Sequence, residues 1–171
     1  RRQRQMCIRD SYRAMDKLGS AGVSAIAAEA KVDERYLKEW LASNAARGYV
    51  SYDAEADKFS LTPEQASVFA RESEPTCIQG LIQGVVGQFV KEDVAIDVFK
   101  TGRGRPWGEH HECCFCGTER FFRPAYAGHL LDEWIPALDG VEDKLKLGAK
   151  VADIGCGLGT SSILMAEQFP N

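Results

Sequence analysis

The residues with the clearest chemical purpose lie near the end of the chain, in the stretch Asp153-Ile-Gly-Cys-Gly-Leu-Gly159. Its three alternating glycines lack Cβ atoms, which permits positive φ angles and lets a ligand approach the backbone closely. Val151, Ala152 and Ile154 predict a short buried strand before this turn, and residues 161–169 predict a helix after it. A helix that starts there directs free N–H groups and the positive end of its dipole toward a ligand.

The spacing of the glycines narrows the class of ligand. A dinucleotide-binding fingerprint requires G-x-G-x-x-G, but the sixth position counted from Gly155 is Thr160. A Walker phosphate loop requires a lysine after the glycines, and none follows here. The remaining pattern is Asp-x-Gly-x-Gly-x-Gly, with Asp153 two residues before the first glycine. A purely structural glycine turn in some other α/β protein is the alternative interpretation.

The composition is that of an ordinary globular protein. The 171 residues are 44% hydrophobic and 27% charged, and the formal net charge of −4 gives no reason to expect nucleic acid or an anionic membrane as a partner. No run approaches the roughly 18 apolar residues of a membrane span, and no signal peptide is recognisable. We therefore expect a cytoplasmic protein without a membrane partner, in which the six cysteines are reduced thiols.

Residues 12–72 predict a winged-helix domain. Three helices and then two strands are expected, over residues 12–18, 25–30, 34–47, 49–52 and 58–61. Ser24 and Asp33 are the expected N-caps of the second and third helices, and Thr62 with Gln65 predicts a capping box that starts a fourth. Three helices followed by a hairpin indicate an architecture and leave the function open.

The charge of the third predicted helix bears on DNA binding. Three basic residues and three acidic residues balance along it, namely Arg35, Lys38, Arg47, Asp33, Glu34 and Glu39. Phosphate contacts supply most nonspecific DNA affinity, so a neutral reading helix does not favour nucleic acid as a partner. Packing or dimerisation is the preferred role, with a DNA-binding transcriptional regulator and a dimerisation module as alternatives.

Residues 73–147 predict a helical connector. The apolar stretch over residues 77–99 predicts one or two helices, in which Gly80, Gly84 and Gly87 leave one face open for close packing against a neighbour. A further helix is expected over residues 118–134, kinked at a proline, and a helix or turn follows at residues 138–147.

Two histidines and three cysteines crowd into residues 109–117. Zinc sites usually pair ligands from two separated clusters, and no second cluster is present in the sequence. We therefore expect a loop that lines a pocket and no metal, with zinc as the alternative. Phe121, Phe122 and Tyr126 follow at helical spacing, and they either wall a ligand pocket or form an aromatic core stripe.

The order of these pieces resembles the bacterial class I S-adenosylmethionine-dependent methyltransferases that carry an N-terminal winged-helix domain. Three stretches carry the resemblance, Pro106-Trp-Gly-Glu109, Glu119-Arg-Phe-Phe-Arg-Pro124 and Val151-Ala-Asp-Ile-Gly-Cys-Gly-Leu-Gly159. It implies a mostly α chain with a small β-hairpin: a winged helix, a helical connector over the cofactor pocket, and the first strand and helix of a truncated Rossmann-like α/β methyltransferase domain. The resemblance covers residues 12–171.

The resemblance also implies a cofactor and partners. S-adenosylmethionine is the expected cofactor, and the residues implied to bind it are Asp153, Gly155, Cys156, Gly157 and Gly159, with Phe122 and Tyr126 as pocket walls. A small-molecule methyl acceptor and a second copy of the chain are the expected partners. No catalytic residue is assigned, because methyl transfer mainly requires alignment of the two reacting atoms and exclusion of water.

Both ends of the chain carry expectations of their own. Residues 1–11 do not continue into the pattern that follows, and we predict that they are a non-native leader. Residues 148–171 are predicted to begin a methyltransferase domain without completing it, since a doubly wound sheet needs several more strands. The fragment by itself is therefore expected to be inactive.

Overall fold

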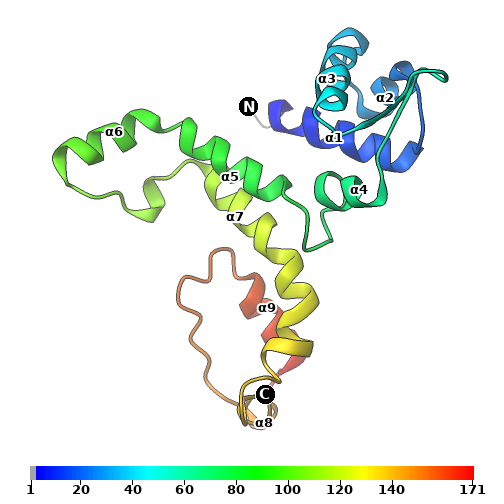
Figure 1. Cartoon of the computed structure of the whole chain (residues 1–171). Coiled ribbons are helices and arrows are strands. Elements are labelled where there is room, and N and C mark those ends of the chain that lie inside the picture. The colour runs from blue at the N-terminus through cyan, green and yellow to red at the C-terminus, as the bar shows by residue number, and fades with distance from the viewer. Residues whose placement is uncertain (1–2) are drawn as a thin grey trace. The chain divides into compact units, whose positions relative to one another are not determined.

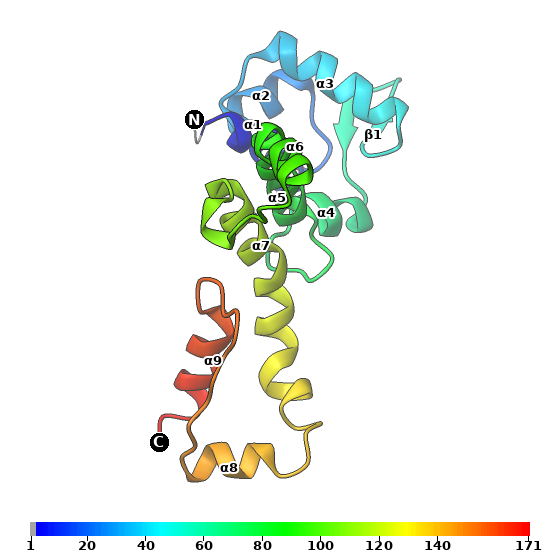
Figure 2. The same ribbon diagram turned by 90° about the vertical axis from the view of Figure 1, so that its left-hand side faces the viewer.

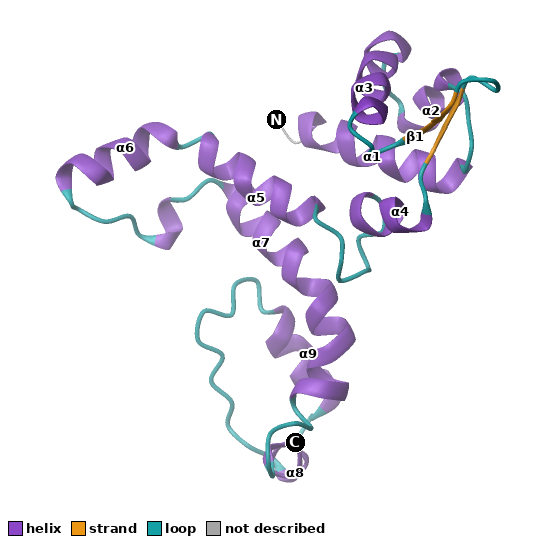
Figure 3. Cartoon of the chain, in the orientation of Figure 1, coloured by secondary structure: helices purple, strands orange, loops and turns teal. Residues whose placement is uncertain are grey.

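The computed structural model describes residues 3–171, with side chains from residue 9 onward. The chain divides into two units, residues 1–79 and 80–171. Helices predominate in the described residues, and the sheet formed there has two strands (Figure 3). Within the same residues no helix is long and apolar enough to cross a membrane.

The first unit is a winged helix (Figure 1). Its elements are α1 (Gln3–Leu18), α2 (Val23–Ala30), α3 (Glu34–Ala46), β1 (Ser51–Asp53), β2 (Lys58–Ser60) and α4 (Pro63–Phe69). The two strands are antiparallel, with Tyr52 opposite Phe59. The prediction of a mostly helical chain with an N-terminal winged helix and a small hairpin is therefore confirmed.

Two helix starts in this unit match the prediction and two differ from it. The Asp33 carboxylate accepts a hydrogen bond from the Tyr36 backbone N–H at 3.1 Å, and the predicted capping box at Thr62 is formed. The predicted Ser24 cap is wrong, because Gly22 occupies the N-cap and the Ser24 hydroxyl donates to Glu34 instead. Helix α1 begins well before residue 12, since no glycine or proline interrupts residues 3–11. Arg1 and Arg2 lie outside the described residues.

The core of the first unit joins α1, α2, α3 and β2, and Phe69 of α4 packs against it. Leu37 and Leu41 of α3 are buried in this core. The Tyr12 hydroxyl donates to Oδ1 of Asn44 at 3.0 Å, and the Tyr12 ring stacks on Phe69 with centroids 4.9 Å apart. Burial raises the pKa of Tyr12 to about 12, so the phenol stays neutral and keeps its proton for this hydrogen bond.

The second unit is built mainly from helices (Figure 2). They are α5 (Gln79–Phe89), α6 (Glu92–Thr101), the 3₁₀ turn η1 (Trp107–Glu109), α7 (Glu112–Ala125), the π-helix η2 (Tyr126–Trp134), α8 (Val141–Leu147) and α9 (Thr160–Gln168). The apolar stretch predicted as one or two helices therefore forms two, α5 and α6.

Helices α5 and α7 touch through their backbones. A Cβ atom built on Gly117 would lie 2.4 Å from the backbone nitrogen of Gly84, and one on Gly80 would lie 2.4 Å from that of Phe121. Real Cβ atoms do not come this close to backbone atoms. The predicted close packing of the glycine face is confirmed, and glycine is required on both helices.

One expectation for the helices of the second unit is wrong. The predicted loop over residues 109–117 is helical from Glu112, because the His111 side chain accepts a hydrogen bond from the Cys113 N–H and caps α7. Beyond Pro124 the predicted helix continues to Trp134, as the π-helix η2.

The strand predicted before the glycine turn is also absent. Residues 151–154 have no regular structure, and Val151 and Ile154 are exposed. A parallel strand is held by hydrogen bonds to neighbouring strands, and no segment of residues 3–171 pairs with this one. The apolar pattern is present in the sequence, but a strand also needs a partner.

The backbone contact between α5 and α7 predicts a large effect from a single methyl group. We expect Gly117→Ala to lower the free energy of unfolding by about 1–3 kcal/mol, because the new Cβ overlaps the backbone of α5. Gly128→Ala is the matched control: it lies in the π-helix with nothing within 4 Å of a Cβ, and should stabilise by up to about 1 kcal/mol. Urea unfolding followed by circular dichroism measures both, and equal effects would contradict the packing described.

Candidate functional site

The glycine turn adopts the backbone conformation that its sequence predicts. Gly155, Gly157 and Gly159 have φ angles of +78°, +59° and +84°. A Cβ on any of the three would meet nothing within 4 Å, so the backbone conformation and not crowding requires glycine. The space beside these residues is therefore open to a ligand.

Helix α9 starts directly behind this turn, and its first three residues each donate a side-chain hydroxyl to a carboxylate. Thr160 donates to Glu119 of α7 at 3.0 Å. Ser161 and Ser162 donate to the same oxygen of Asp153, at 2.6 and 2.7 Å. The turn is thus held at both of its ends, and both negative charges lie near the positive end of the α9 dipole.

A cavity of about 130 Å³ separates the glycine turn from α7. One wall is aromatic and the other is the turn itself; the lining residues are Trp107, Phe115, Thr118, Glu119, Phe122, Tyr126, Gly155, Cys156, Gly157, Leu158 and Thr160. The structure therefore brings Phe122 and Tyr126 together with three of the predicted loop residues. Phe121 lies outside this lining, and Gly159 adjoins it as the N-cap of α9.

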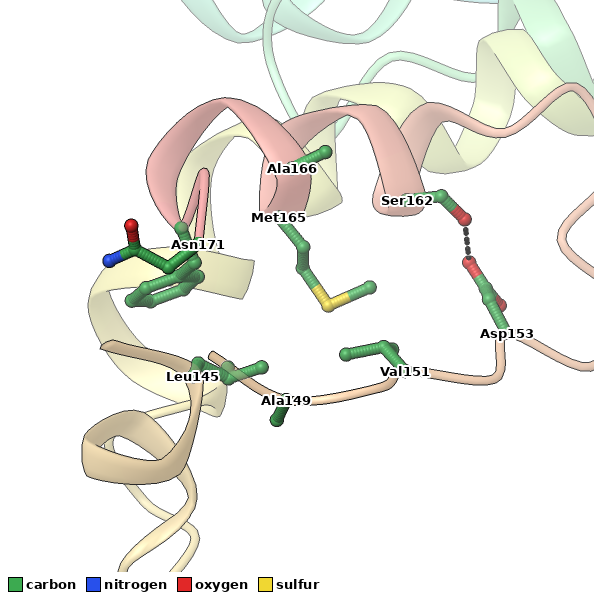
Figure 4. A pocket seen from close by; sticks show the side chains of 9 residues that line it. Leu145, Ala149, Val151, Asp153, Ser162, Met165, Ala166 and Asn171 are labelled. Atoms are coloured by element: carbon green, nitrogen blue, oxygen red, sulfur yellow. Dashed lines mark hydrogen bonds between the residues drawn. The ribbon is translucent and has the colours of Figure 1, made fainter. Parts of the chain in front are cut away.

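Asp153 lies elsewhere. It lines a second cavity of about 380 Å³ with Leu145 of α8 and Met165 of α9 (Figure 4), and with Phe169, which follows α9. Hydrogen bonds from the two serine hydroxyls hold the pKa of the Asp153 carboxyl below its usual value. The ionised carboxylate therefore faces the first turn of α9 and not the aromatic cavity.

Glu119 is a charged residue of the cavity that the sequence did not lead us to predict as a site residue. Its side chain is 10% exposed and forms an ion pair with Arg123 one turn along α7. The Arg123 hydrogen bond, with help from Thr160, holds the pKa of Glu119 below its usual value. Phe115, Glu119, Phe122 and Tyr126 recur at helical spacing, so the signal was present once the helix was known to begin at Glu112.

The histidine and cysteine cluster is divided by the start of α7. His111 caps the helix, and Cys114 is buried, where its sulfur accepts a hydrogen bond from Gln88 at 3.2 Å. His110 lies outside the helix against Trp107; burial, and then Arg105, lower its pKa. No three metal-binding side chains gather closely enough to hold an ion in the described part of the chain.

The size of the aromatic cavity limits what it holds. Sites for drug-sized ligands measure about 300–1,000 Å³, so a 130 Å³ cavity accommodates one end of such a ligand. Aromatic faces attract cationic groups, and a glycine turn admits a ligand to its backbone. The residues present therefore fit the sulfonium and amino-acid end of S-adenosylmethionine better than its adenosine.

Comparisons with known proteins agree with this fold. Residues 9–71 match the family model described as the Rv2258c-like winged HTH domain. Eleven chains of solved structures match, among them one titled "PigF with SAH", with a TM-score of 0.51 and 16% sequence identity. That match covers 97% of this chain and 51% of the other, so the chain spans about half the length of that protein. No significant match is found among curated proteins.

The hydrogen bonds from Ser161 and Ser162 lead to a prediction for the pKa of Asp153. In a Ser161→Ala, Ser162→Ala variant, we expect the Asp153 pKa to rise toward its usual value, as measured by ¹³C carboxyl NMR. Because folding lowers this pKa, Asp153 stabilises the fold above its unfolded pKa, and the contribution is lost as the pH falls through the folded value. Ser51→Ala, in the first unit, should leave the titration unchanged. An Asp153 pKa at or above the usual value in the unmodified chain would contradict the hydrogen bonding.

Proposed function

We propose that this chain supplies the cofactor turn and its aromatic cover to a class I S-adenosylmethionine-dependent methyltransferase that acts on a small molecule. One observation carries the proposal: the cavity between α7 and the glycine turn combines aromatic walls with an open glycine backbone. The solved structure titled "PigF with SAH" adds support, because SAH is what S-adenosylmethionine becomes when it loses its methyl group.

The activity is proposed for the full-length protein. The fold likeness to the PigF chain extends over about half of that chain, and the sequence identity is too low to transfer a substrate. The methyl acceptor is therefore assigned only as a class. A small molecule is favoured because the neutral α3 helix offers little attraction to nucleic acid.

The residues of the chain act by binding and positioning. When bound, S-adenosylmethionine supplies an electrophilic methyl group on a sulfonium. The backbone at Gly155 and Gly157 receives the amino-acid end of the cofactor, and the rings of Phe122 and Tyr126 exclude water and present π-electron density to the positive sulfur.

Glu119 plays a positioning role in this proposal. Its carboxylate is ionised and bonded to Arg123 and Thr160, so it holds α9 against α7 and is not available to take a proton from an acceptor. S-adenosylmethionine would supply a good leaving group, so alignment of the reacting atoms by the residues of the chain would supply much of the rate.

Cofactor binding tests the proposal directly. Isothermal titration of the full-length protein with S-adenosylmethionine should give saturable binding. Gly157→Val should weaken it by about 100-fold or more, because a β-branched residue at φ +59° distorts the turn. Gly104→Val is the matched control, since Gly104 also has a positive φ, +74°, but lies outside the cavity. The absence of binding at millimolar cofactor would overturn the proposed function.

A DNA-binding regulator is the second candidate, favoured by the match to a winged HTH family model. Helix α3 exposes Arg35 and Lys38 but also Glu34 and Glu39. If the chain is a regulator, its retention on a DNA column should fall steeply as the salt concentration rises. The Arg35→Ala, Lys38→Ala variant should then be retained even less. We expect no retention at low salt, and Glu39→Ala serves as the control of opposite charge. Salt-sensitive retention that depends on the two basic residues would favour the regulator.

A further inference from the structure

The first unit has a cavity of its own, with a volume of about 500 Å³. It lies beside the turn between α2 and α3 and along the first two turns of α3. Its lining residues are Ser11, Lys31, Val32, Asp33, Tyr36, Leu37 and Trp40. Binding sites for drug-sized ligands measure about 300–1,000 Å³, so this cavity is large enough for a small molecule.

Two aromatic rings form the wall of this cavity along α3. Tyr36 and Trp40 are four residues apart and therefore share one face of the helix. Tyr36 is 78% exposed, whereas Trp40 is half-buried and meets the ring of Tyr12 edge-on, with centroids 4.9 Å apart. Leu37 and Val32 add apolar surface. Because the contact with Tyr12 holds the Trp40 ring in place, the wall is prepared for a flat or apolar group.

A positive residue lines the cavity at the end of α2. Lys31 is the C-cap of this helix and has a φ angle of +56°, a conformation that favours glycine. A glycine would adopt this conformation more readily but would bring no charge to the cavity. The Lys31 ammonium forms no ion pair with any residue that the structure describes, so it is available to a ligand.

A negative residue lines the cavity two positions further along. Oδ1 of Asp33 accepts the hydrogen bond from the Tyr36 N–H that caps α3. The other carboxylate oxygen has no hydrogen-bond partner within the described residues. The turn between α2 and α3 therefore offers one positive and one negative group beside an aromatic wall.

We propose that this cavity binds a free α-amino acid with an aromatic or large apolar side chain. The ligand carboxylate pairs with Lys31, its ammonium pairs with Asp33, and its side chain lies against Tyr36 and Trp40. The inference is independent of the proposed methyl transfer, because every residue of the cavity belongs to the first unit.

The two charges distinguish an amino acid from other aromatic ligands. An aromatic anion would pair with Lys31 but bring its negative charge close to Asp33, and an aromatic cation would have the opposite problem with Lys31. A neutral ring would leave both charges without a partner. A zwitterion whose charged groups share one carbon atom complements both residues at once.

Isothermal titration of the chain with L-phenylalanine tests the proposal. Saturable binding is expected with a dissociation constant of about 100 µM or lower, a strength that a ligand of about a dozen non-hydrogen atoms can supply. Two analogues are matched controls, since hydrocinnamate lacks the ammonium and phenethylamine lacks the carboxylate. Each should bind about 10-fold more weakly or worse, because it leaves one charge of the cavity without a partner.

Two substitutions remove the charges one at a time and keep the backbone. Asp33→Asn removes the negative charge but keeps the cap of α3, because asparagine caps a helix as well as aspartate does. Lys31→Gly removes the ammonium and suits the positive φ. Each should weaken L-phenylalanine binding about 10-fold, while Asp33→Asn should not weaken hydrocinnamate and Lys31→Gly should not weaken phenethylamine. Lys38→Gln is the matched control, since Lys38 lies on α3 but outside the cavity lining.

A further pair of variants separates this cavity from the glycine turn. S-adenosylmethionine also ends in an α-amino acid, so L-phenylalanine could in principle bind at the turn instead. Gly157→Val, which is expected to weaken cofactor binding, should leave L-phenylalanine binding unchanged. Tyr36→Ser removes an exposed ring from the cavity wall and should weaken L-phenylalanine binding. The reverse pattern would assign the amino acid to the glycine turn and overturn the proposal.

Three results with the unmodified chain or its charge variants would also overturn the proposal. They are the absence of saturable binding at about 5 mM L-phenylalanine, equal binding of the three ligands, and full binding after both charge substitutions. Far-ultraviolet circular dichroism checks that each variant keeps its helices. If a variant fails to fold, the comparison of the three ligands on the unmodified chain still decides the outcome.

Discussion

The backbone contact between Gly117 of α7 and Gly84 of α5 is the constraint on which the second unit depends. Because both positions lack a side chain, the two helices meet at a distance that no other residue permits. This contact fixes one face of α7 against α5. The opposite face, which carries Phe115, Glu119 and Phe122, is thereby presented to the glycine turn. A helix that must serve two neighbours needs its small residues on one side and its large ones on the other.

A second constraint is electrostatic and holds the turn itself. The loop from Asp153 to Thr160 has no strand pairing in the described part of the chain, and its glycines give it little intrinsic preference for one conformation. Carboxylates at Asp153 and Glu119 accept hydrogen bonds from hydroxyls of the first turn of α9. Each is charge-assisted and therefore stronger than a neutral hydrogen bond. The open backbone of the turn thus lies between two fixed points.

The two units differ in how completely their helices bury their apolar faces. In the winged helix, Met15, Ile26 and Leu41 are fully buried, and the aromatic contacts of Tyr12 close the core. In the second unit, large apolar side chains stay exposed on α5, around the glycine turn and on α9. The cavity lined by Met165 and Phe169 shows that α9, α8 and the segment before the glycine turn also carry apolar surface.

The sequence by itself determined the features that depend on near neighbours. The Asp33 cap, the capping box at Thr62, the hairpin and the positive φ angles of the glycine turn all arise within a few residues, so local chemistry predicts them. The glycine face of α5 was also readable, because three small residues at helical spacing leave a helix face open to a neighbour. The prediction from local patterns was wrong where two nearby residues could each serve as the N-cap, as with Gly22 and Ser24 at the start of α2.

Only the tertiary structure decided the rest. Residues 151–154 have the apolar pattern of a strand but form none, because a strand needs hydrogen bonds from a distant segment. The role of Glu119 depends on Thr160, 41 residues away, and no spacing rule joins the two. From the sequence, Phe122 and Tyr126 could either wall a pocket or form a core stripe. Because α7 turns its glycine side toward α5, the two rings lie beside the cavity. Sequence fixes what each residue can do locally, and the packing of helices determines which residues meet.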